Sequence, residues 1–293
     1  MGLGSSHFDV TDSAMLIPEK WSNRVNDFFR AQLKAAAFFE DWSEDVADGG
    51  DIIHRPVITE MAAQTKTAAT EVVLQDNTDS TITLTINTHK HVAFMIEDVV
   101  SSKFKGSYKA QDVYAKNAGY TTAGSLEDAL LLLINGFSQT VGSSSANLAD
   151  SNIRAAIAYL DAANVPQEDR AFFLHPNVVW NQLMGIDRYT LVQNVAGANN
   201  PVLKGQTHTL YGYPVITTSR LTVTTGHRNG GYAHSSAIAF AVANPSGMSG
   251  PNHVRLQTDY ILQHLGTLVV ADVIFGAIEN RDTSGVWIKA KSN

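Results

Sequence analysis

Two histidines placed two residues apart are the first side chains in this sequence that could hold a metal ion. His89 and His91 share one face of a pattern typical of a β-strand, a geometry that can direct two imidazoles at one ion. A metal site also needs further ligands and a carboxylate that orients the imidazole, and none is evident nearby. We interpret the pair as a half-exposed strand face and expect no metal and no cofactor.

Six further histidines stand singly and could act as general bases only if folding brought a nucleophile to one of them. They are His175, His208, His227, His234, His253 and His264. The sequence has no G-x-x-x-x-G-K-[ST] phosphate loop, no G-x-G-x-x-G, no G-x-S-x-G elbow and no H-E-x-x-H. This favours a protein that is not an enzyme, and an α/β enzyme with an unrecognised active site stays an alternative.

The charge balance does not favour a protein that neutralises many phosphate groups. The chain has 21 Lys+Arg against 28 Asp+Glu, a formal net charge of −7. Its one basic cluster is Lys103, Lys105, Lys109 and Lys116, and Asp112 dilutes it. We interpret the cluster as a solvated helix face, which could still tune the charge of a wall that faces a polyanion.

The 293 residues contain no cysteine, which excludes thiol catalysis, disulfides and Cys-ligated metals. Charged residues make up 17% of the chain, against about 25% in ordinary soluble domains. Because interface cores are depleted in charge, this composition fits burial against other copies of the chain. The longest aliphatic stretch, Ala129–Ile134, is far shorter than the roughly 20 apolar residues of a membrane span, so we expect no membrane partner.

The elements that must position any site begin with an apolar helix pattern. Trp21 and Phe28 belong to a set of apolar residues spaced three and four apart, which predicts a helix over Pro18–Glu40. Carboxylates without any Lys or Arg follow between Glu40 and Asp51. A calcium loop needs a central Gly among its ligands, and here the glycines come at the end, so we expect a flexible acidic turn.

From Asp51 to Asp98 the apolar period is that of a strand. Threonines alternate with aliphatic residues over 81–86, and apolar residues alternate again over 92–96. Val72–Leu74 comes before them across a turn-rich connector and predicts a partner strand. The region therefore predicts a long antiparallel arm. Its segment Met61–Thr70 has no large apolar residue besides Met61, so it is expected to be mobile or to lie on a neighbour.

Helix signals return after residue 106. Apolar residues repeat with helical spacing over 126–137, and Ser125 with Asp128 has the form of an N-terminal capping box. Gly119 and Gly124 separate two helices in the local pattern. In the pattern as a whole they are soft points of one long helix, because an isolated Gly costs only about 1 kcal/mol against Ala.

The second half of the chain mixes helices with strands and then ends in strands. A helix around 153–160, a buried strand at 171–174 and a helix from Pro176 indicate mixed α/β structure. Two Gly- and Asn-rich stretches, Asp187–Gly205 and Thr222–Gly231, predict loops. Further strands are predicted at 213–217, 237–243, 254–262, 268–278 and 286–288.

Five segments have an order and spacing that point to a known family. They are Ile17–Ser22, Leu84–Phe94, Gly136–Gly142, Phe172–Pro176 and Gly212–Val215. Together with the order of the predicted elements, they resemble the major capsid (coat) protein of tailed bacteriophages over essentially the whole chain. The podovirus-type coat proteins are the members that these segments look like.

The resemblance implies an α+β chain with the Hong Kong 97-like phage capsid fold, without an active site or cofactor. It implies one long spine helix in place of two. The implied segments are an N-terminal arm with an amphipathic helix over 1–50, an extended β-hairpin loop over 51–98, a spine helix and peripheral domain over 99–149, an axial domain over 150–250, and peripheral return strands over 251–293.

The implied function is structural. Copies of the chain would assemble as hexamers and pentamers into an icosahedral head shell that encloses double-stranded DNA without sequence-specific binding. Scaffolding and portal proteins are the implied partners, and the implied location is the virion capsid, assembled in the host cytoplasm. A cellular encapsulin-type nanocompartment shell around a cargo enzyme is the alternative with the same fold.

The candidate site is therefore an intersubunit surface. The residues expected in it are Ala62, Gln64, Thr65, Lys66, Thr67 and Thr70 from the arm tip, with Trp21 and Phe28 from the N-terminal helix. Some members of the family crosslink a loop lysine to a neighbour's asparagine, and Lys66 is the only lysine in the mobile part of this arm. Nothing in the sequence identifies a partner asparagine, so an uncrosslinked shell is expected.

Overall fold

The computed structural model of the chain describes residues 33–47, 49–58, 60–76, 79–98, 110–186, 209–224, 226–243 and 254–292. Several expectations lie outside these ranges. They concern Trp21, Phe28, Lys103, Lys105, Lys109, His208, His253 and the loop Asp187–Gly205.

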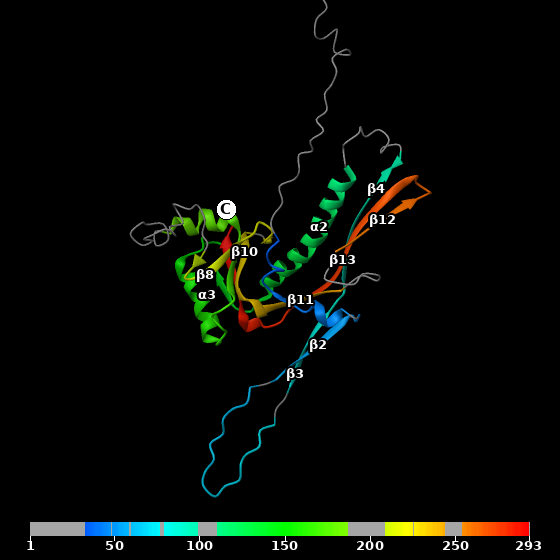
Figure 1. Cartoon of the computed structure of the whole chain (residues 1–293). Coiled ribbons are helices and arrows are strands. Elements are labelled where there is room, and N and C mark those ends of the chain that lie inside the picture. Colours follow the sequence, from blue (N-terminus) through cyan, green and yellow to red (C-terminus); the bar gives the residue numbers. More distant parts are fainter. Residues whose placement is uncertain are drawn as a thin grey trace, which may run out of the picture.

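One sheet is built around a single long strand, β13 (Gly266–Glu279). β13 pairs antiparallel with β12 (Arg255–Ile261), β11 (Ile238–Ala243) and β4 (Thr88–Glu97). The short strand β1 (Glu40–Asp41) adds to β11 in parallel. Figure 1 shows this sheet on one side of the molecule, with the helix α2 (Ala110–Leu133) running along it.

The helix α2 is continuous, which confirms the single helix that the resemblance implied and makes the two-helix interpretation wrong. Ser125 is not an N-cap, because it lies inside α2 and its hydroxyl donates to the carbonyl of Thr122. Gly124 serves packing: the guanidinium of Arg220 donates to its carbonyl at 3.0 Å, in space that a Cβ would occupy. The same guanidinium binds Asp128 one turn later.

A second, seven-stranded sheet forms the other lobe (Figure 1). The helices α3 (Asp150–Ala162) and α4 (Pro176–Asn181) accompany it, and the side chains of Ile153 and Leu160 pack with Phe172 and Ile288 in its core. Its strand order is β5 (Thr140–Gly142), β14 (Gly285–Lys291), β10 (His227–His234), β6 (Arg170–Leu174), β8 (Tyr213–Thr217) and β7 (Thr209–Leu210), with β9 (Val223–Thr224) beside β10.

The loop predicted at Thr222–Gly231 is wrong, because this stretch supplies β9 and most of the central strand β10. Gly230 and Gly231 are buried there and let neighbouring atoms approach closely. A Cβ on Gly230 would lie 2.8 Å from the carbonyl oxygen of Phe173, and one on Gly231 would lie 2.4 Å from Cγ2 of Ile134. These glycines mark a tight packing site inside a sheet and not a turn.

The helix predicted to continue to Glu40 is wrong over residues 33–40, which form a turn and then β1. The buried carboxylate of Glu127 on α2 accepts hydrogen bonds from the backbone N–H groups of Lys34, Ala35 and Ala36. Phe39 then stacks on Phe173, with ring centroids 5.2 Å apart. These tertiary contacts replace the local helical hydrogen bonds.

The acidic turn predicted after Glu40 is also more ordered than expected. It contains a 3₁₀ turn, η1 (Ser43–Val46), and the side chains of Trp42 and Val46 are buried. They pack with Ile53 and Leu84 in a small core against β11. Further 3₁₀ turns are η2 (Ile134–Gly136), η3 (Leu183–Gly185), η4 (Ser235–Ala237) and η5 (Asp282–Ser284).

The arm is a separate two-stranded ribbon that extends away from the two larger sheets (Figure 1). β2 (Ile52–Val57) pairs antiparallel with β3 (Ser80–Thr85), with the threonines on the outer face as predicted. The partner strand predicted at Val72–Leu74 is wrong, since residues 71–76 form no regular structure. Residues 92–96 belong to β4, and β4 pairs with β13 and not within the arm. The five-segment division of the chain stays a prediction.

The base of the arm approaches β13 closely at one residue, Gly276. A Cβ on Gly276 would lie 2.3 Å from the carbonyl oxygen of Thr85 and 3.0 Å from Cα of Ile86. Both obstacles are backbone atoms, so a side chain here must push the end of β3 away from the sheet.

We predict that Gly276→Ala destabilises the subunit by about 1–3 kcal/mol, the usual cost of overpacking. Thermal unfolding measures the effect. Gly185→Ala is the matched control, because nothing lies within 4 Å of its Cβ position, and its change should stay within about 0.5 kcal/mol. Equal melting temperatures for the two variants would contradict the close approach.

Candidate assembly surfaces

The arm tip carries the expected intersubunit residues on an open segment. Every residue from 60 to 76 is exposed, which includes Ala62, Gln64, Thr65, Lys66, Thr67 and Thr70. Local hydrogen bonds shape the segment: the N–H of Ala62 donates to Oε1 of Gln75, and the hydroxyl of Thr70 donates to the carbonyl of Thr67 at 2.7 Å. The tip is thus held in shape by its own hydrogen bonds, and no other described part of the subunit covers it.

Three consecutive apolar side chains on the returning limb of the arm are equally uncovered. Val72, Val73 and Leu74 are 66%, 69% and 90% exposed. A run of this kind costs free energy in water, and contiguous apolar surface on a soluble chain marks an interaction site. Sequence reasoning missed it by assigning these residues to a paired strand. The available signal was the lack of any large apolar residue in 62–70, the segment that a strand there would have to pair with.

A second uncovered apolar surface lies beside α2. Phe94 of β4 contacts Tyr114 of α2, with ring centroids 5.6 Å apart, so this face of the sheet lies under the helix. The strand register places Leu256 and Tyr260 of β12 on the same face. The side chains of Tyr114, Leu256 and Tyr260 are each about half exposed. We call Leu256 and Tyr260 of β12, together with the neighbouring Tyr114 of α2, the β12 strip.

The pair His89 and His91 does have a carboxylate nearby, contrary to expectation. The β4–β13 pairing places Asp272 opposite His91, and Nε2 of His89 lies 3.0 Å from its Oδ2. Arg255 binds both oxygens of Asp272, and these hydrogen bonds hold the pKa of Asp272 below its usual value. The available signal was that Asp272 is the only charged residue of the strand predicted at 268–278. Among the described residues, no three His, Asp or Glu side chains gather to hold a metal ion.

The single histidines with described side chains have structural contacts. Nδ1 of His175 accepts the N–H of Asn177 at the start of α4, and its Nε2 faces Arg228 at 3.2 Å. Burial, followed by the nearby Arg228, lowers the pKa of His175. His227 lies beside Trp287, with ring centroids 6.0 Å apart, and His264 is exposed in the turn after β12.

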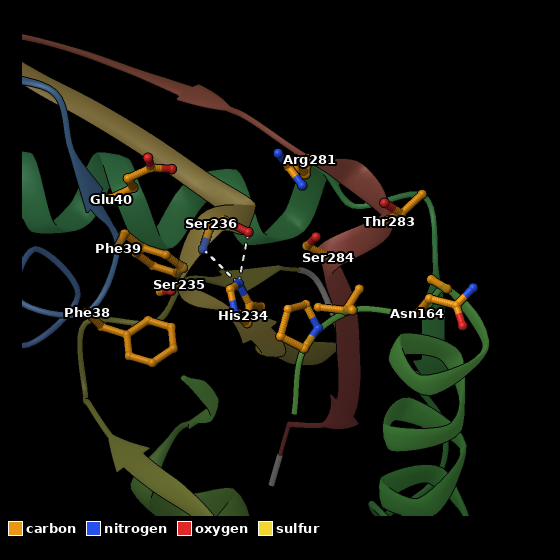
Figure 2. A pocket seen from close by; sticks show the side chains of 13 residues that line it. Phe38, Phe39, Glu40, Asn164, His234, Ser235, Ser236, Arg281, Thr283 and Ser284 are labelled. Atoms are coloured by element: carbon orange, nitrogen blue, oxygen red, sulfur yellow. Dashed lines mark hydrogen bonds between the residues drawn. The ribbon is translucent and has the colours of Figure 1, made fainter. Parts of the chain in front are cut away.

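His234 is the histidine that comes close to a nucleophile. It lines a cavity of about 610 Å³, and its Nδ1 lies 2.8 Å from the hydroxyl of Ser236 (Figure 2). The same Nδ1 accepts the backbone N–H of Ser236, so the imidazole caps η4. Burial lowers the pKa of His234. A nitrogen whose lone pair is already held by a backbone amide is poorly placed to take a proton from the hydroxyl.

Two carboxyl groups share the corner where β13 leads into β14. Burial, together with a hydrogen bond to Asp282, raises the pKa of Glu279 to about 7. Burial opposes ionisation of Asp282 as well, but hydrogen bonds from Ser138 outweigh it and lower its pKa. Glu279 therefore holds the proton of the pair, and the corner carries one negative charge in place of two.

No helix in the described ranges is both long and apolar enough to cross a membrane. No protein-family model matches the sequence, and no curated protein matches it.

Solved structures match the chain over almost its whole length. A structure titled "Mycobacterium phage Che8" has a TM-score of 0.79 at 18% identity, over 93% of this chain and 96% of that one. The capsid structure of the cyanophage P-SCSP1u has a TM-score of 0.73 at 14% identity, over 99% and 97%. The mature capsid of bacteriophage PhiM1 has a TM-score of 0.73 at 11% identity, over 93% and 91%.

The expected α+β, Hong Kong 97-like fold is thereby confirmed. The likeness covers the arm, the long helix and both sheets together, because more than nine tenths of each chain is matched. At these identities the likeness establishes the fold.

The Glu279–Asp282 corner predicts a pH dependence of stability. Folded Glu279 has a pKa of about 7, above its ordinary value of 4.5, so the folded state binds more protons between these values. The contribution of Glu279 to the free energy of unfolding must therefore fall as the pH rises from about 4.5 to 7, whereas the lowered pKa values of His175 and His234 act in the opposite direction. Glu279→Gln keeps the group neutral and should remove this fall, with the largest gain in melting temperature above pH 7.

Thermal unfolding between pH 4.5 and 8 measures this effect. Glu168→Gln removes an exposed carboxylate as the matched control, and it should leave the pH dependence of the wild type unchanged. If the melting temperatures of Glu279→Gln and of the wild type change equally with pH, the raised pKa of Glu279 is contradicted.

Proposed function

We propose that this chain is the major capsid protein of a tailed bacteriophage, a structural protein whose copies form the icosahedral head shell around double-stranded DNA. The observation that carries the proposal is the full-length likeness to chains from phage capsids. A second support is an arm whose tip is wholly exposed and meets no partner surface among the described residues of its own subunit. The chain would then be located in the virion capsid and assemble in the host cytoplasm.

The finer parts of the proposal rest on the sequence resemblance. They are the podovirus type, the grouping of copies into hexamers and pentamers, and the scaffolding and portal partners. Trp21 and Phe28 stay predicted interface residues on the same ground. An encapsulin-type shell is distinguished by its contents, because it would enclose a cargo enzyme and no genome.

The intersubunit contact follows from two uncovered apolar surfaces on one chain. We propose that Val72–Leu74 of one copy covers the β12 strip of the next copy, and that the tip residues 62–70 extend this contact. Donor and acceptor surfaces differ, so the contact is head-to-tail, and contacts of that kind close into rings when the rotation allows. Burial of both surfaces removes apolar area from water at each contact.

Electron microscopy and size-exclusion chromatography of the purified full chain test the function. Closed shells or large oligomers are expected, with the arm protected from protease in shells and cut early in isolated subunits. Deleting residues 62–70 should leave the subunit fold nearly intact by circular dichroism and abolish or weaken closed assembly. A Gly/Ser segment of equal length in their place controls for arm length. A single subunit-sized species under all ionic conditions, even with scaffold present, would refute the proposal.

Cysteine trapping tests the contact itself, because the natural chain has no thiol that could react. The pair Leu74→Cys with Leu256→Cys should give a ladder of disulfide-linked oligomers on a non-reducing gel after assembly. Leu74→Cys with Trp180→Cys is the matched control, since Trp180 is also about half exposed but lies on α4 in the other lobe. Equal ladders from both pairs, or none from the first in intact shells, would place the arm elsewhere.

A further inference from the structure

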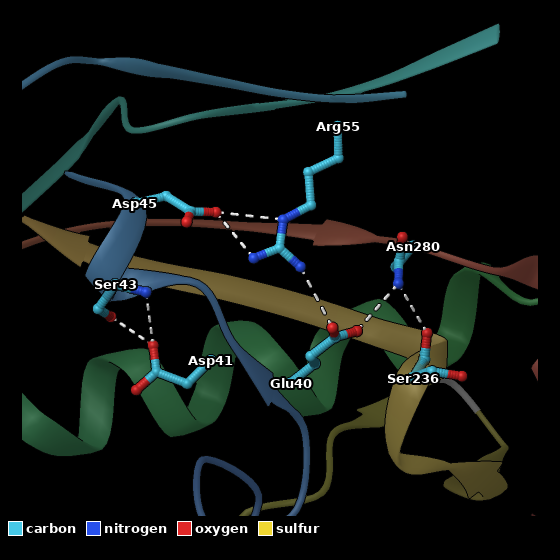
Figure 3. A network of polar contacts seen from close by, with 7 residues as sticks. All are labelled: Glu40, Asp41, Ser43, Asp45, Arg55, Ser236 and Asn280. Atoms are coloured by element: carbon cyan, nitrogen blue, oxygen red, sulfur yellow. Dashed lines mark hydrogen bonds and ion pairs between the residues drawn. The ribbon is translucent and has the colours of Figure 1, made fainter. Parts of the chain in front are cut away.

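Arg55 occupies the base of the arm and contacts three side chains of the preceding segment, two of which, Asp45 and Glu40, are drawn in Figure 3. Its guanidinium binds Oδ2 of Asp45 through Nη2 at 2.7 Å and through Nε at 3.1 Å. Its Nη1 binds Oε1 of Glu40 at 3.3 Å. The same group lies over the ring of Trp42, 4.0 Å from the centroid. A planar fork with five N–H donors suits this combination of stacking and hydrogen bonding.

The network continues from Glu40 into the body of the subunit. The side-chain amide of Asn280 donates to Oε2 of Glu40 at 3.3 Å and to the carbonyl of Ser236 at 3.0 Å (Figure 3). Asn280 follows β13, and Ser236 lies in η4 between β10 and β11. Arg55 is therefore linked through Glu40 to the place where the two sheets meet.

The fully buried apolar contacts of the arm base lie one step below Arg55 along the ribbon. Ile53 and Leu84 face each other across β2 and β3 and are buried in the core with Val46. Arg55 pairs with Ile82, two residues further toward the tip, and Ile82 packs against the same core but is only partly buried. The ion pairs of Arg55 therefore add a polar restraint where the apolar contact is weaker.

We infer that Arg55 is a positioning residue of the arm, which fixes the direction of β2 and β3 in the free subunit before a second copy is met. This inference rests on the proposed function for its purpose, but it concerns the subunit alone. A pre-oriented arm loses less conformational freedom when it docks, so assembly gains from the same contacts.

The ion pairs of Arg55 form a restraint that salt can weaken. The side chains of Arg55, Glu40 and Asp45 are 38%, 40% and 43% exposed, so each ion pair is partly screened by water. Salt weakens such pairs, because the Debye length falls from about 10 Å at 0.1 M to about 3 Å at 1 M. The direction of the arm should therefore depend on ionic strength, whereas its apolar base should not.

Single-molecule energy transfer tests the inference at picomolar concentration, where subunits are separate. Dyes are placed on the cysteine-free chain at Thr67→Cys in the tip and Tyr159→Cys on α3. The wild-type arm should give a narrow distribution of transfer efficiency at low salt. Arg55→Gln should broaden it and raise the fraction of displaced arms about fivefold, and Arg55→Lys should fall between them.

Arg154→Gln is the matched control, because it removes one exposed arginine paired with Asp150 on α3 and should leave the distribution narrow. In 1 M salt the wild type should broaden toward Arg55→Gln, while that variant should change little. This salt series decides the matter even if Arg55→Gln fails to fold.

A distribution that stays narrow in high salt and in the folded Arg55 variants would overturn the inference. That result would leave shell formation untouched. Conversely, a failure of the chain to form shells would leave the measured arm direction valid, so the two proposals fail separately.

Discussion

The structure depends on one long strand. β13 supplies the pairing partner for β4, β12 and β11, and its Gly276 is where the arm base comes within backbone contact of the sheet. The arm and the β12 strip are each attached to this strand either directly or through one neighbouring element. A strand paired along its length by three others resists bending. This rigidity holds the base of the thin arm in a defined position.

The helix α2 packs against both sheets and thereby holds the two lobes together. The C-terminal half of α2 and the start of η2 bury Leu130, Leu131 and Ile134 against Phe275 of β13 and Phe173 of the second sheet. Glu127, one turn earlier, binds the backbone of the segment that leads to β1. Because a buried carboxylate is costly unless its oxygens are bonded, those N–H groups stabilise the charge of Glu127, and residues 33–40 form a turn and β1 in place of the predicted helix.

Elements with a strong internal period were predictable from the sequence, and elements that depend on distant partners were not. The alternation over 81–86 correctly predicted β3, and the apolar run over 268–278 correctly predicted β13. Gly230 and Gly231 suggested a loop because their role is to admit Ile134 and Phe173, which no local pattern reveals. The exposure of the tip residues was predictable from their lack of large apolar side chains, and their role between subunits stays a prediction. The β12 strip and Arg55 required the strand register and the packing of η1.

The paired base of the arm and its tip are free to change in evolution to different degrees. Beyond Val57 and Ser80 the arm contacts none of the three buried cores, so a change of its length there is invisible to the folding of its own subunit. Lengthening such a loop costs little, about 0.6 kcal/mol for each doubling. If the chain forms a shell as proposed, selection on the length of this segment is exerted by the neighbouring copy. The arm can evolve with the geometry of the assembly while the body that carries it stays unchanged.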